Sequence, residues 1–219
     1  MFRRHGAQYL RQRGAIPTAE ELVLKALASC RTASLGGHVY ACPHCDYRRQ
    51  AYNSCRNRHC PKCHAAGSAE WLTQQRAHLL PVGYFHVVFT VPPAIAELAW
   101  QNKQLLYSIL FRASADTLRE IAADPKHLGA EIGFLTVLHT WGQNLHHHPH
   151  VHCVVPAGGL SPDQTRWIAC PENFFLPVRV LSRVFRGKFL QQVREAYDRG
   201  DLSFHGNLAQ HQAAAAFRQ

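Results

Sequence analysis

The chain contains the segment HHHPHVHCVV at residues 146–155, in which histidines alternate with apolar residues toward the end. Side chains alternate between the two faces of a β-strand, so His150 and His152 would point to the same side, about 7 Å apart at the backbone. The apolar residues that separate and follow them would pack against a core. The alternation predicts a strand with a metal-binding face, although a histidine run can also form a loop or a loose metal-binding tract.

Two imidazoles make an incomplete metal site, so a third ligand is needed. His148 lies on the same predicted face, but about 13 Å separate it from His152 along a straight strand. We therefore expect that a single ion does not take His148, His150 and His152 together.

A neighbouring strand is a better source of the third ligand. If residues 132–140 and 149–155 form an antiparallel hairpin, His139 falls roughly opposite His150. His139 is then a candidate ligand, and Gln143 at the strand end could also reach the site. A hydrogen-bonded core histidine is the competing interpretation of His139.

Such a site would leave coordination positions open, and this suits a divalent ion that polarises a phosphate. Mixed nitrogen and oxygen ligands would accept Mg²⁺ or Mn²⁺, and three histidines would also accept Zn²⁺. Water as the nucleophile would give a hydrolase, whereas a tyrosine hydroxyl would give a covalent DNA intermediate.

Eight cysteines in a chain without a visible secretory signal indicate metal binding more than disulfides. Two Cys-x-x-Cys pairs, Cys42/Cys45 and Cys60/Cys63, are separated by 14 residues. Each pair can supply two thiolates from one tight turn, so the spacing predicts a structural four-cysteine zinc site.

Further possible zinc ligands lie close to these pairs. Cys30 and Cys55, together with two of three nearby histidines, would suffice for a second zinc ion. The spacing does not choose among His38, His59 and His64.

The charge of the chain is strongly positive, with a net charge of +10. Residues 1–80 hold 12 Lys and Arg against 4 Asp and Glu, while residues 81–219 hold 12 against 10. A basic surplus suits a polyanionic partner, so the N-terminal region is predicted to contact DNA. The candidate DNA-binding residues are Arg48, Arg49, Arg56, Arg58 and Lys62.

The fold class is predicted to be α+β, with a domain boundary at Pro81-Val82-Gly83. Residues 1–80 would form a zinc-binding, DNA-contacting domain, and residues 81–219 would carry an antiparallel sheet with helices. Thr18 and Glu21 have the spacing of a capping box. Helices are expected over 8–29, 66–79, 94–123 and 178–199, and strands over 84–91, 132–140 and 149–155, while Ala213 to Ala216 favour the start of a further helix.

No stretch approaches the roughly 18 uninterrupted apolar residues that a membrane span needs, and residues 2–5 are not followed by the apolar run of a signal peptide. We therefore expect a soluble, cytoplasmic protein without a membrane partner. The sequence does not indicate an oligomeric state.

Several segments together resemble a known family, the two-tyrosine rolling-circle transposases of the IS91-like insertion sequences and the related common-region elements. His150-Val151-His152 is similar to the histidine–hydrophobic–histidine motif of HUH single-strand endonucleases. The other matching segments are Cys30-Arg31-Thr32-Ala33, Gly36-Gly37-His38, residues 54–63, Leu138-His139-Thr140-Trp141-Gly142-Gln143 and Pro156-Ala157-Gly158-Gly159.

The resemblance implies a zinc-binding N-terminal domain followed by an HUH nuclease domain on an RRM-like antiparallel sheet. It also implies an activity: one DNA strand at the end of the element is nicked when a tyrosine attacks the phosphate. His150 and His152 would hold the metal that polarises this phosphate.

The tyrosines depart from the family pattern. Members carry a pair of nucleophilic tyrosines, separated by three residues, on a helix after the HUH strand. Here Tyr197 is the sole tyrosine beyond His152, and Asp201 stands four residues later. We expect Tyr197 to be structural and the chain to be an N-terminal portion that lacks the catalytic tyrosines. The competing interpretations are a non-catalytic, zinc-dependent DNA-binding remnant and a water-using metallohydrolase or metal-storage protein.

Overall fold

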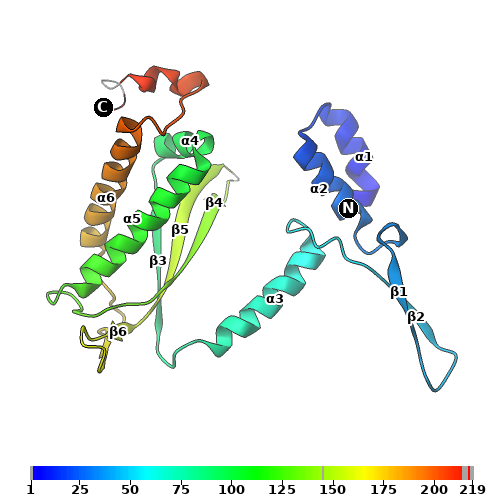
Figure 1. Ribbon diagram of the computed structural model, residues 1–219, viewed down its shortest axis with the longest axis horizontal. Coiled ribbons are helices and arrows are strands. Elements are labelled where there is room, and N and C mark those ends of the chain that lie inside the picture. Colours follow the sequence, from blue (N-terminus) through cyan, green and yellow to red (C-terminus); the bar gives the residue numbers. More distant parts are fainter. Residues whose placement is uncertain (1, 145, 214–216, 218–219) are drawn as a thin grey trace. The chain divides into compact units, whose positions relative to one another are not determined.

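The computed structural model describes residues 2–144, 146–213 and 217, so most of the helix start predicted at Ala213 to Ala216 lies outside the described residues. The chain divides into two compact units, Met1–Leu79 and Leu80–Gln219. Helices and antiparallel strands occur in both units (Figure 1), which confirms the predicted α+β class.

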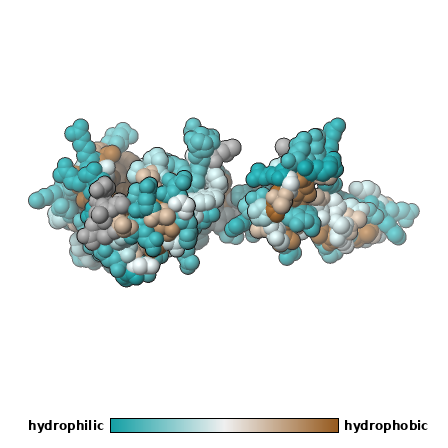
Figure 2. Space-filling model, turned by 90° about the horizontal axis from the view of Figure 1, so that it is seen from above, coloured by the Kyte–Doolittle hydropathy of each residue, from teal (hydrophilic) through white to brown (hydrophobic). Residues whose placement is uncertain are grey.

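The N-terminal unit consists of short helices and one β-hairpin. Its elements are α1 (Phe2–Arg13), α2 (Thr18–Ser29), η1 (Ala33–Leu35), β1 (Gly37–Ala41), β2 (Arg48–Tyr52) and α3 (Pro61–Ala77). The strands pair antiparallel from Gly37↔Tyr52 at the base to Ala41↔Arg48 beside the turn. Figure 2 shows hydrophobic residues gathered on the visible face of this unit, among hydrophilic ones.

The predicted helix over 8–29 is two helices. Gly14 has a φ of +72°, which glycine adopts readily, and it follows the last residue of α1. The N-cap of α2 is Pro17, so Thr18 is the first residue of the helix and not its cap. The predicted capping box is therefore wrong, because the N-cap must precede the first helical residue.

The C-terminal unit is built around a three-stranded antiparallel sheet with the order β3-β5-β4. A second sheet pairs β6 with β7. The elements are β3 (Tyr84–Thr90), α4 (Pro93–Gln101), α5 (Lys103–Ala123), β4 (Leu135–Trp141), β5 (His147–Pro156), β6 (Gly158–Leu160), β7 (Trp167–Ala169), α6 (Val178–Asp198) and η2 (Gly206–Gln212).

The core of this unit lies between one face of the sheet and the helices. Val151, Cys153 and Val155 of β5 are fully buried, in one cluster with Leu106 and Leu110 of α5. Burial of such side chains contributes about 1.5–3 kcal/mol each. In Figure 1, α5 and α6 lie side by side, and buried residues of both belong to this core.

The opposite face of the sheet is open. Val88 of β3 and Val137 of β4 are 41% and 39% exposed, and His150 and His152 of β5 share this face by the alternation of the strand. The sequence predicts that strand 84–91 is buried, but one of its two faces is exposed. The open face is the one that carries the histidines.

The helices of the C-terminal unit follow the predicted pattern, with one break. Asn102 separates α4 from α5, and its side-chain amide donates to the carbonyls of Leu98 and Ser203. Strand β4 begins at Leu135, three residues later than predicted, and Glu131 before it forms an isolated bridge with Leu160. Among the helices of the described residues, none combines the length and apolar character needed to cross a lipid bilayer.

Candidate metal centre

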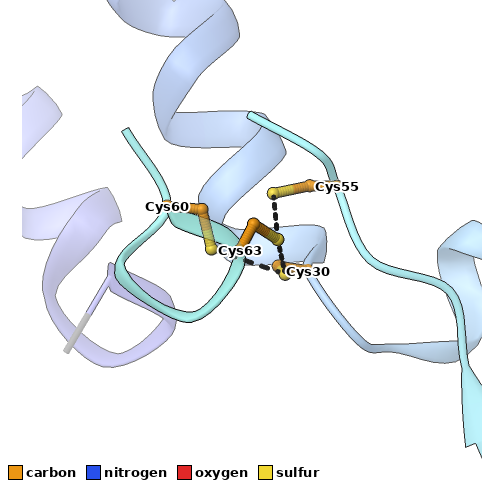
Figure 3. A group of neighbouring side chains, drawn as sticks. All are labelled: Cys30, Cys55, Cys60 and Cys63. Carbon is orange, nitrogen blue, oxygen red and sulfur yellow. Dashed lines mark hydrogen bonds between the residues drawn. The ribbon is translucent and has the colours of Figure 1, made fainter. Parts of the chain in front are cut away.

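Four cysteines of the N-terminal unit meet in one cluster, which we call the cysteine cluster (Figure 3). Cys30 follows α2, Cys55 follows β2, Cys60 is the N-cap of α3, and Cys63 lies in the first turn of α3. The sulfur of Cys30 lies 3.5 Å from that of Cys60 and 3.6 Å from that of Cys63, which is 3.7 Å from the sulfur of Cys55.

These sulfur distances fit a tetrahedral zinc ion. With Zn–S bonds of about 2.3 Å, the sulfurs of a four-cysteine site lie about 3.8 Å apart. The backbone N–H of Cys63 lowers the pKa of Cys60 to about 6, whereas burial raises the pKa of Cys55 to about 12. A divalent cation among the sulfurs would hold all four as thiolates. Cys30 and Cys60 are buried, so the centre would be closed to solvent on that side.

The cluster differs from the predicted pairing of the two Cys-x-x-Cys motifs. Cys42 and Cys45 follow β1 and lie at the turn of the hairpin, outside the cysteine cluster. Each strand residue adds about 3.4 Å, so four steps place the turn about 14 Å from the hairpin base. The predicted site of Cys42, Cys45, Cys60 and Cys63 is therefore wrong as a single centre.

Closure of the hairpin explains which cysteines meet instead. The backbone N–H of Arg31 donates to the carbonyl of Asn53, so the residues on both sides of the hairpin are held together. Cys30 and Cys55 lie next to this bond and join Cys60 and Cys63. The predicted second site, formed by Cys30 and Cys55 with two histidines, is also wrong, because these two cysteines lie with Cys60 and Cys63.

The remaining N-terminal candidates are spread over the unit. The ring of His64 contacts the hydroxyl of Ser68, and His59 and His38 lie outside the cysteine cluster. A hydrogen bond from the backbone N–H of His44 lowers the pKa of Cys42. Among the described residues, Cys42 and Cys45 belong to no group of three or more metal ligands.

The second centre, which we call the histidine cluster, consists of His139, His150 and His152, with ligand nitrogens within 4.8 Å of one another. His139 on β4 pairs with His150 on β5, which confirms the predicted register. The ring of His152 lies 4.1 Å from that of His139 and 4.9 Å from that of His150, measured between centroids. The structure thus brings three imidazoles together on the open face of the sheet.

Hydrogen bonds orient two of these rings. The Nδ1 atom of His150 lies 2.7 Å from the carbonyl oxygen of His148, to which it can donate only as the Nδ1–H tautomer. The Nδ1 atom of His152 lies 2.6 Å from Nε2 of His86, and these two rings stack. Both contacts leave Nε2 free to bind a metal, and hydrogen bonds of this kind fix the tautomer of metal-binding histidines.

The clearest sign of a metal ion is the Nε2 atom of His152. It is buried and has no hydrogen-bond partner among the described residues. A buried nitrogen without a partner is costly, and a metal ion would satisfy it. Burial, followed by the charges of His139, His150 and His86, lowers the pKa of His152 and so favours the neutral form of the ring, which is the form that binds a metal.

His86 is the functional residue that sequence reasoning missed. It lies on β3, two residues before Val88, which pairs with His152. The alternation within strand 84–91 could have placed residue 86 on the open face. The pairing of β3 with β5, which puts His86 beside His152, is not visible in the sequence.

Other candidates lie outside the histidine cluster. His148 and Gln143 line a separate pocket beside α4. The Tyr197 hydroxyl donates to the carbonyl of Gln212, and its ring stacks on that of Phe217 with centroids 4.0 Å apart. These contacts agree with the predicted structural role of Tyr197.

The candidate DNA-binding residues are all exposed. Arg48 and Arg49 lie on β2, and Lys62 lies in the first turn of α3. Arg56 and Arg58 line a pocket of about 280 Å³ beside Cys63, together with Arg31. No carboxylate lines this pocket among the described residues, so its charge suits an anion.

Two family models match the chain. Residues 1–91 match a family described as "Transposase zinc-binding domain", and residues 133–219 match one described as "Putative transposase". The described function of the first family and the cysteine cluster agree on a structural zinc centre in the N-terminal unit.

Two curated proteins are similar over most or all of the chain. "Putative transposase y4qJ" of Sinorhizobium fredii is 59% identical over the whole chain, which corresponds to 55% of that protein. "Transposase for insertion sequence element IS801" of Pseudomonas savastanoi pv. phaseolicola is 37% identical over 74% of the chain and 38% of its own length. The chain thus spans about half or less of the length of these relatives.

Solved structures show a weaker likeness. The conjugative relaxase TrwC in complex with oriT DNA, in a metal-bound form, matches with a TM-score of 0.42 and 16% identity, over 50% of this chain and 42% of that chain. TrwC complexed with a 27-mer DNA matches with a TM-score of 0.42 and 17% identity, over 61% of this chain and 52% of that chain. The assignment to a family rests on the family models and the curated relatives.

Proposed function

Because the chain belongs to the IS91-like family of transposases, we propose that it contributes the DNA-binding and metal-binding parts of a transposase that nicks one DNA strand at the end of its element. The histidine cluster is the observation that carries this proposal. Its three imidazoles converge on one point, and one of them has a buried nitrogen without a partner.

We propose His150 and His152 as catalytic metal ligands and His139 as the third. Mg²⁺ or Mn²⁺ bound there would polarise a DNA phosphate and stabilise the charge that develops on it. Three protein ligands leave positions for the phosphate, and the open face of the sheet leaves space for the strand. The hydrogen bonds of His148 and His86 hold the imidazoles in place.

The N-terminal unit would bind DNA phosphates next to its structural zinc site. Arginine forks match phosphate geometry, and Arg31, Arg56 and Arg58 line one pocket in which the part of the chain that the structure describes places no carboxylate. Arg31 and Arg56 both have positive φ values, of 54° and 50°. Such backbone conformations are uncommon for arginine and often mark functional positions. Exposed Arg48, Arg49 and Lys62 would add phosphate contacts.

The nucleophile would be a tyrosine other than Tyr197, whose hydroxyl and ring are both engaged in packing. This engagement also favours the second candidate function, a zinc-dependent DNA-binding protein without strand transfer. Both candidate functions predict that the chain binds DNA. They differ because the transposase forms a covalent bond between a tyrosine and the DNA, and the non-catalytic protein does not.

The test is incubation of the chain with single-stranded DNA of the element end and Mn²⁺, followed by a denaturing gel. Binding without a covalent adduct would support the non-catalytic function of this chain. An adduct that disappears in Tyr197→Phe would overturn the structural role of Tyr197. In a longer protein that carries the tyrosine pair, nicking should be lost in His150→Ala and His152→Ala, and nicking that survives would refute the metal assignment.

A further inference from the structure

A pocket of about 840 Å³ lies between α4 and the turn that joins β4 to β5, and we call it the tryptophan pocket. This volume is within the range of about 300–1,000 Å³ that ligand pockets occupy. Trp100 of α4 lines it and is 50% exposed. Figure 1 shows α4 beside the ends of β5 and β4 at which this turn lies.

Aromatic rings form one wall of the tryptophan pocket. The centroid of the Trp100 ring lies 5.0 Å from that of His147 and 6.1 Å from that of Trp141, both in edge contacts. Trp141 is 53% exposed. Of these three rings, Trp100 and His147 line the pocket, and Trp141 packs against Trp100. The half-exposed Trp100 ring leaves aromatic surface for a flat ligand.

Hydrogen bonds hold one ring of this wall in place. The ring of His147 contacts the Ala96 carbonyl through Nδ1, at 3.0 Å, and the Tyr107 hydroxyl through Nε2, at 2.9 Å. The pairing of β4 with β5 shifts register between His139 and Trp141, and an irregularity of this kind re-aims side chains. Trp141 thereby contacts Trp100 of α4.

The tryptophan pocket adjoins the histidine cluster. His148 lines the pocket, and its ring centroid lies 5.4 Å from that of His150. The carbonyl oxygen of His148 also faces Nδ1 of His150. A ligand seated in the pocket would therefore lie next to a group bound by the histidine cluster.

The charges around the pocket indicate what kind of ligand fits. The carboxylate of Glu97 lines the pocket and would repel a phosphate, but it can accept hydrogen bonds from amino groups. The ammonium group of Lys103 lies 3.8 Å from the Trp100 ring centroid, where it could meet a phosphate outside the pocket. An uncharged, flat group joined to a phosphate matches this arrangement.

We infer that the tryptophan pocket binds one unpaired base of single-stranded DNA, adjacent to the phosphate at the histidine cluster. The inference rests on the proposed function, because the DNA strand is the shared ligand. Bases of single strands stack on aromatic side chains regardless of sequence, whereas bases within a duplex have no free face. The pocket would thus favour single-stranded over double-stranded DNA and position the strand.

The test measures the affinity of the full chain for a single-stranded thymidine oligonucleotide at fixed salt, by fluorescence anisotropy. Stacking contributes about 1–3 kcal/mol per base, so Trp100→Ala should weaken binding about 5- to 150-fold. Trp100→Phe should recover most of this loss. Trp167→Ala, which removes a partly exposed tryptophan on β7, is the matched control and should bind like the unaltered chain.

An abasic oligonucleotide of the same length separates base stacking from phosphate contact. The unaltered chain should prefer the oligonucleotide with bases, and Trp100→Ala should lose this preference. Equal affinity of both proteins for both oligonucleotides, or equal affinity for duplex DNA, would overturn the inference. Mn²⁺ binding measured by calorimetry distinguishes the two proposals: loss of the base preference with normal Mn²⁺ binding supports the pocket, whereas a chain that binds neither Mn²⁺ nor single-stranded DNA refutes both.

Discussion

The cysteine cluster and the histidine cluster show two ways to gather metal ligands. The cysteine cluster takes four ligands from the ends of three elements in a unit with little core, and two of its members are buried. The histidine cluster takes three ligands from the middle of two paired strands, backed by a fully buried face. A closed site with four ligands is typical of structural metals, and an open site with three is typical of catalytic ones.

The comparison also teaches where the stability of each unit originates. In the C-terminal unit, the apolar core positions the imidazoles before any metal binds. In the N-terminal unit, the segments that carry the cysteines have few buried neighbours, so the metal itself would contribute much of the folding free energy. Metal removal should therefore affect the two units differently.

The largest expected effect is the loss of the N-terminal fold when a ligand of the cysteine cluster is removed. Structural zinc contributes about 10–16 kcal/mol in zinc-finger peptides, so Cys63→Ser should unfold most of residues 1–79. Zinc content by mass spectrometry and hydrogen exchange of the full chain measure this, and residues 80–219 should keep their protection.

Cys45→Ser is the matched control, because Cys45 lies at the hairpin turn outside the cluster. It should keep the zinc and the fold. If Cys45→Ser lost zinc as completely as Cys63→Ser, the pairing seen in the structure would be refuted.

The second effect concerns the histidine cluster, where loss of a ligand should abolish metal binding without unfolding. Substitutions of residues that only orient a metal ligand lower metal affinity up to about 100-fold. Because His152→Ala removes a ligand itself, it should lower the affinity for Mn²⁺ by more than this. The melting temperature of the metal-free chain should change little. Calorimetric titration with Mn²⁺ measures the affinity, and His148→Ala is the control that should retain binding.

A smaller effect is expected for His86, which contacts His152 but is not a member of the cluster. His86→Ala should weaken Mn²⁺ binding about 10- to 100-fold, because the tautomer of His152 is no longer fixed. His86→Gln keeps a hydrogen-bond acceptor and should recover part of the affinity. Nitrogen NMR shifts of the His152 ring report the tautomer, and an unchanged tautomer in His86→Ala would contradict this role.

The smallest effect is the response of the metal-free C-terminal unit to acid. Burial lowers the pKa of His147 from its usual value of 6.5, opposed by its hydrogen bond to Ala96. The unfolded chain then binds a proton at a higher pH than the folded chain, so stability decreases as the pH falls below about 6.5. Thermal melting between pH 7.5 and 5 should show this decrease, and His147→Gln should reduce its slope.

In the C-terminal unit, sequence patterns predicted those elements whose residue period and pairing partner lie within a short stretch of the chain. The alternation of HVHCVV predicted the strand, its buried face and its histidine face, and the hairpin geometry predicted that His139 pairs with His150. The helix over 178–199 was predicted within one residue of α6. The structure shows which face of this helix is buried: Leu181, Phe185, Phe189, Val193 and Ala196 recur with the helical period and belong to the same core as residues of α5.

The same approach failed where the result depended on contacts between distant segments. The spacing of the two Cys-x-x-Cys pairs favoured one shared zinc ion, yet the hairpin carries Cys42 and Cys45 away from the base. The sequence does not reveal that His86 contacts His152, because this contact depends on the strand order β3-β5-β4, which no local pattern encodes. The capping box failed at Thr18 because Pro17 takes the capping position.

The sequence by itself determined the ligand types, the α+β class and the face of β5 that carries the histidines, because residue chemistry and strand period act over a few neighbouring positions. Only the tertiary structure decided which cysteines meet, which histidine orients His152 and where the tryptophans lie. These depend on hairpin closure, strand order and a register shift. Each of them is a contact between segments that lie far apart along the chain, and its free energy is summed over many side chains rather than read from one motif.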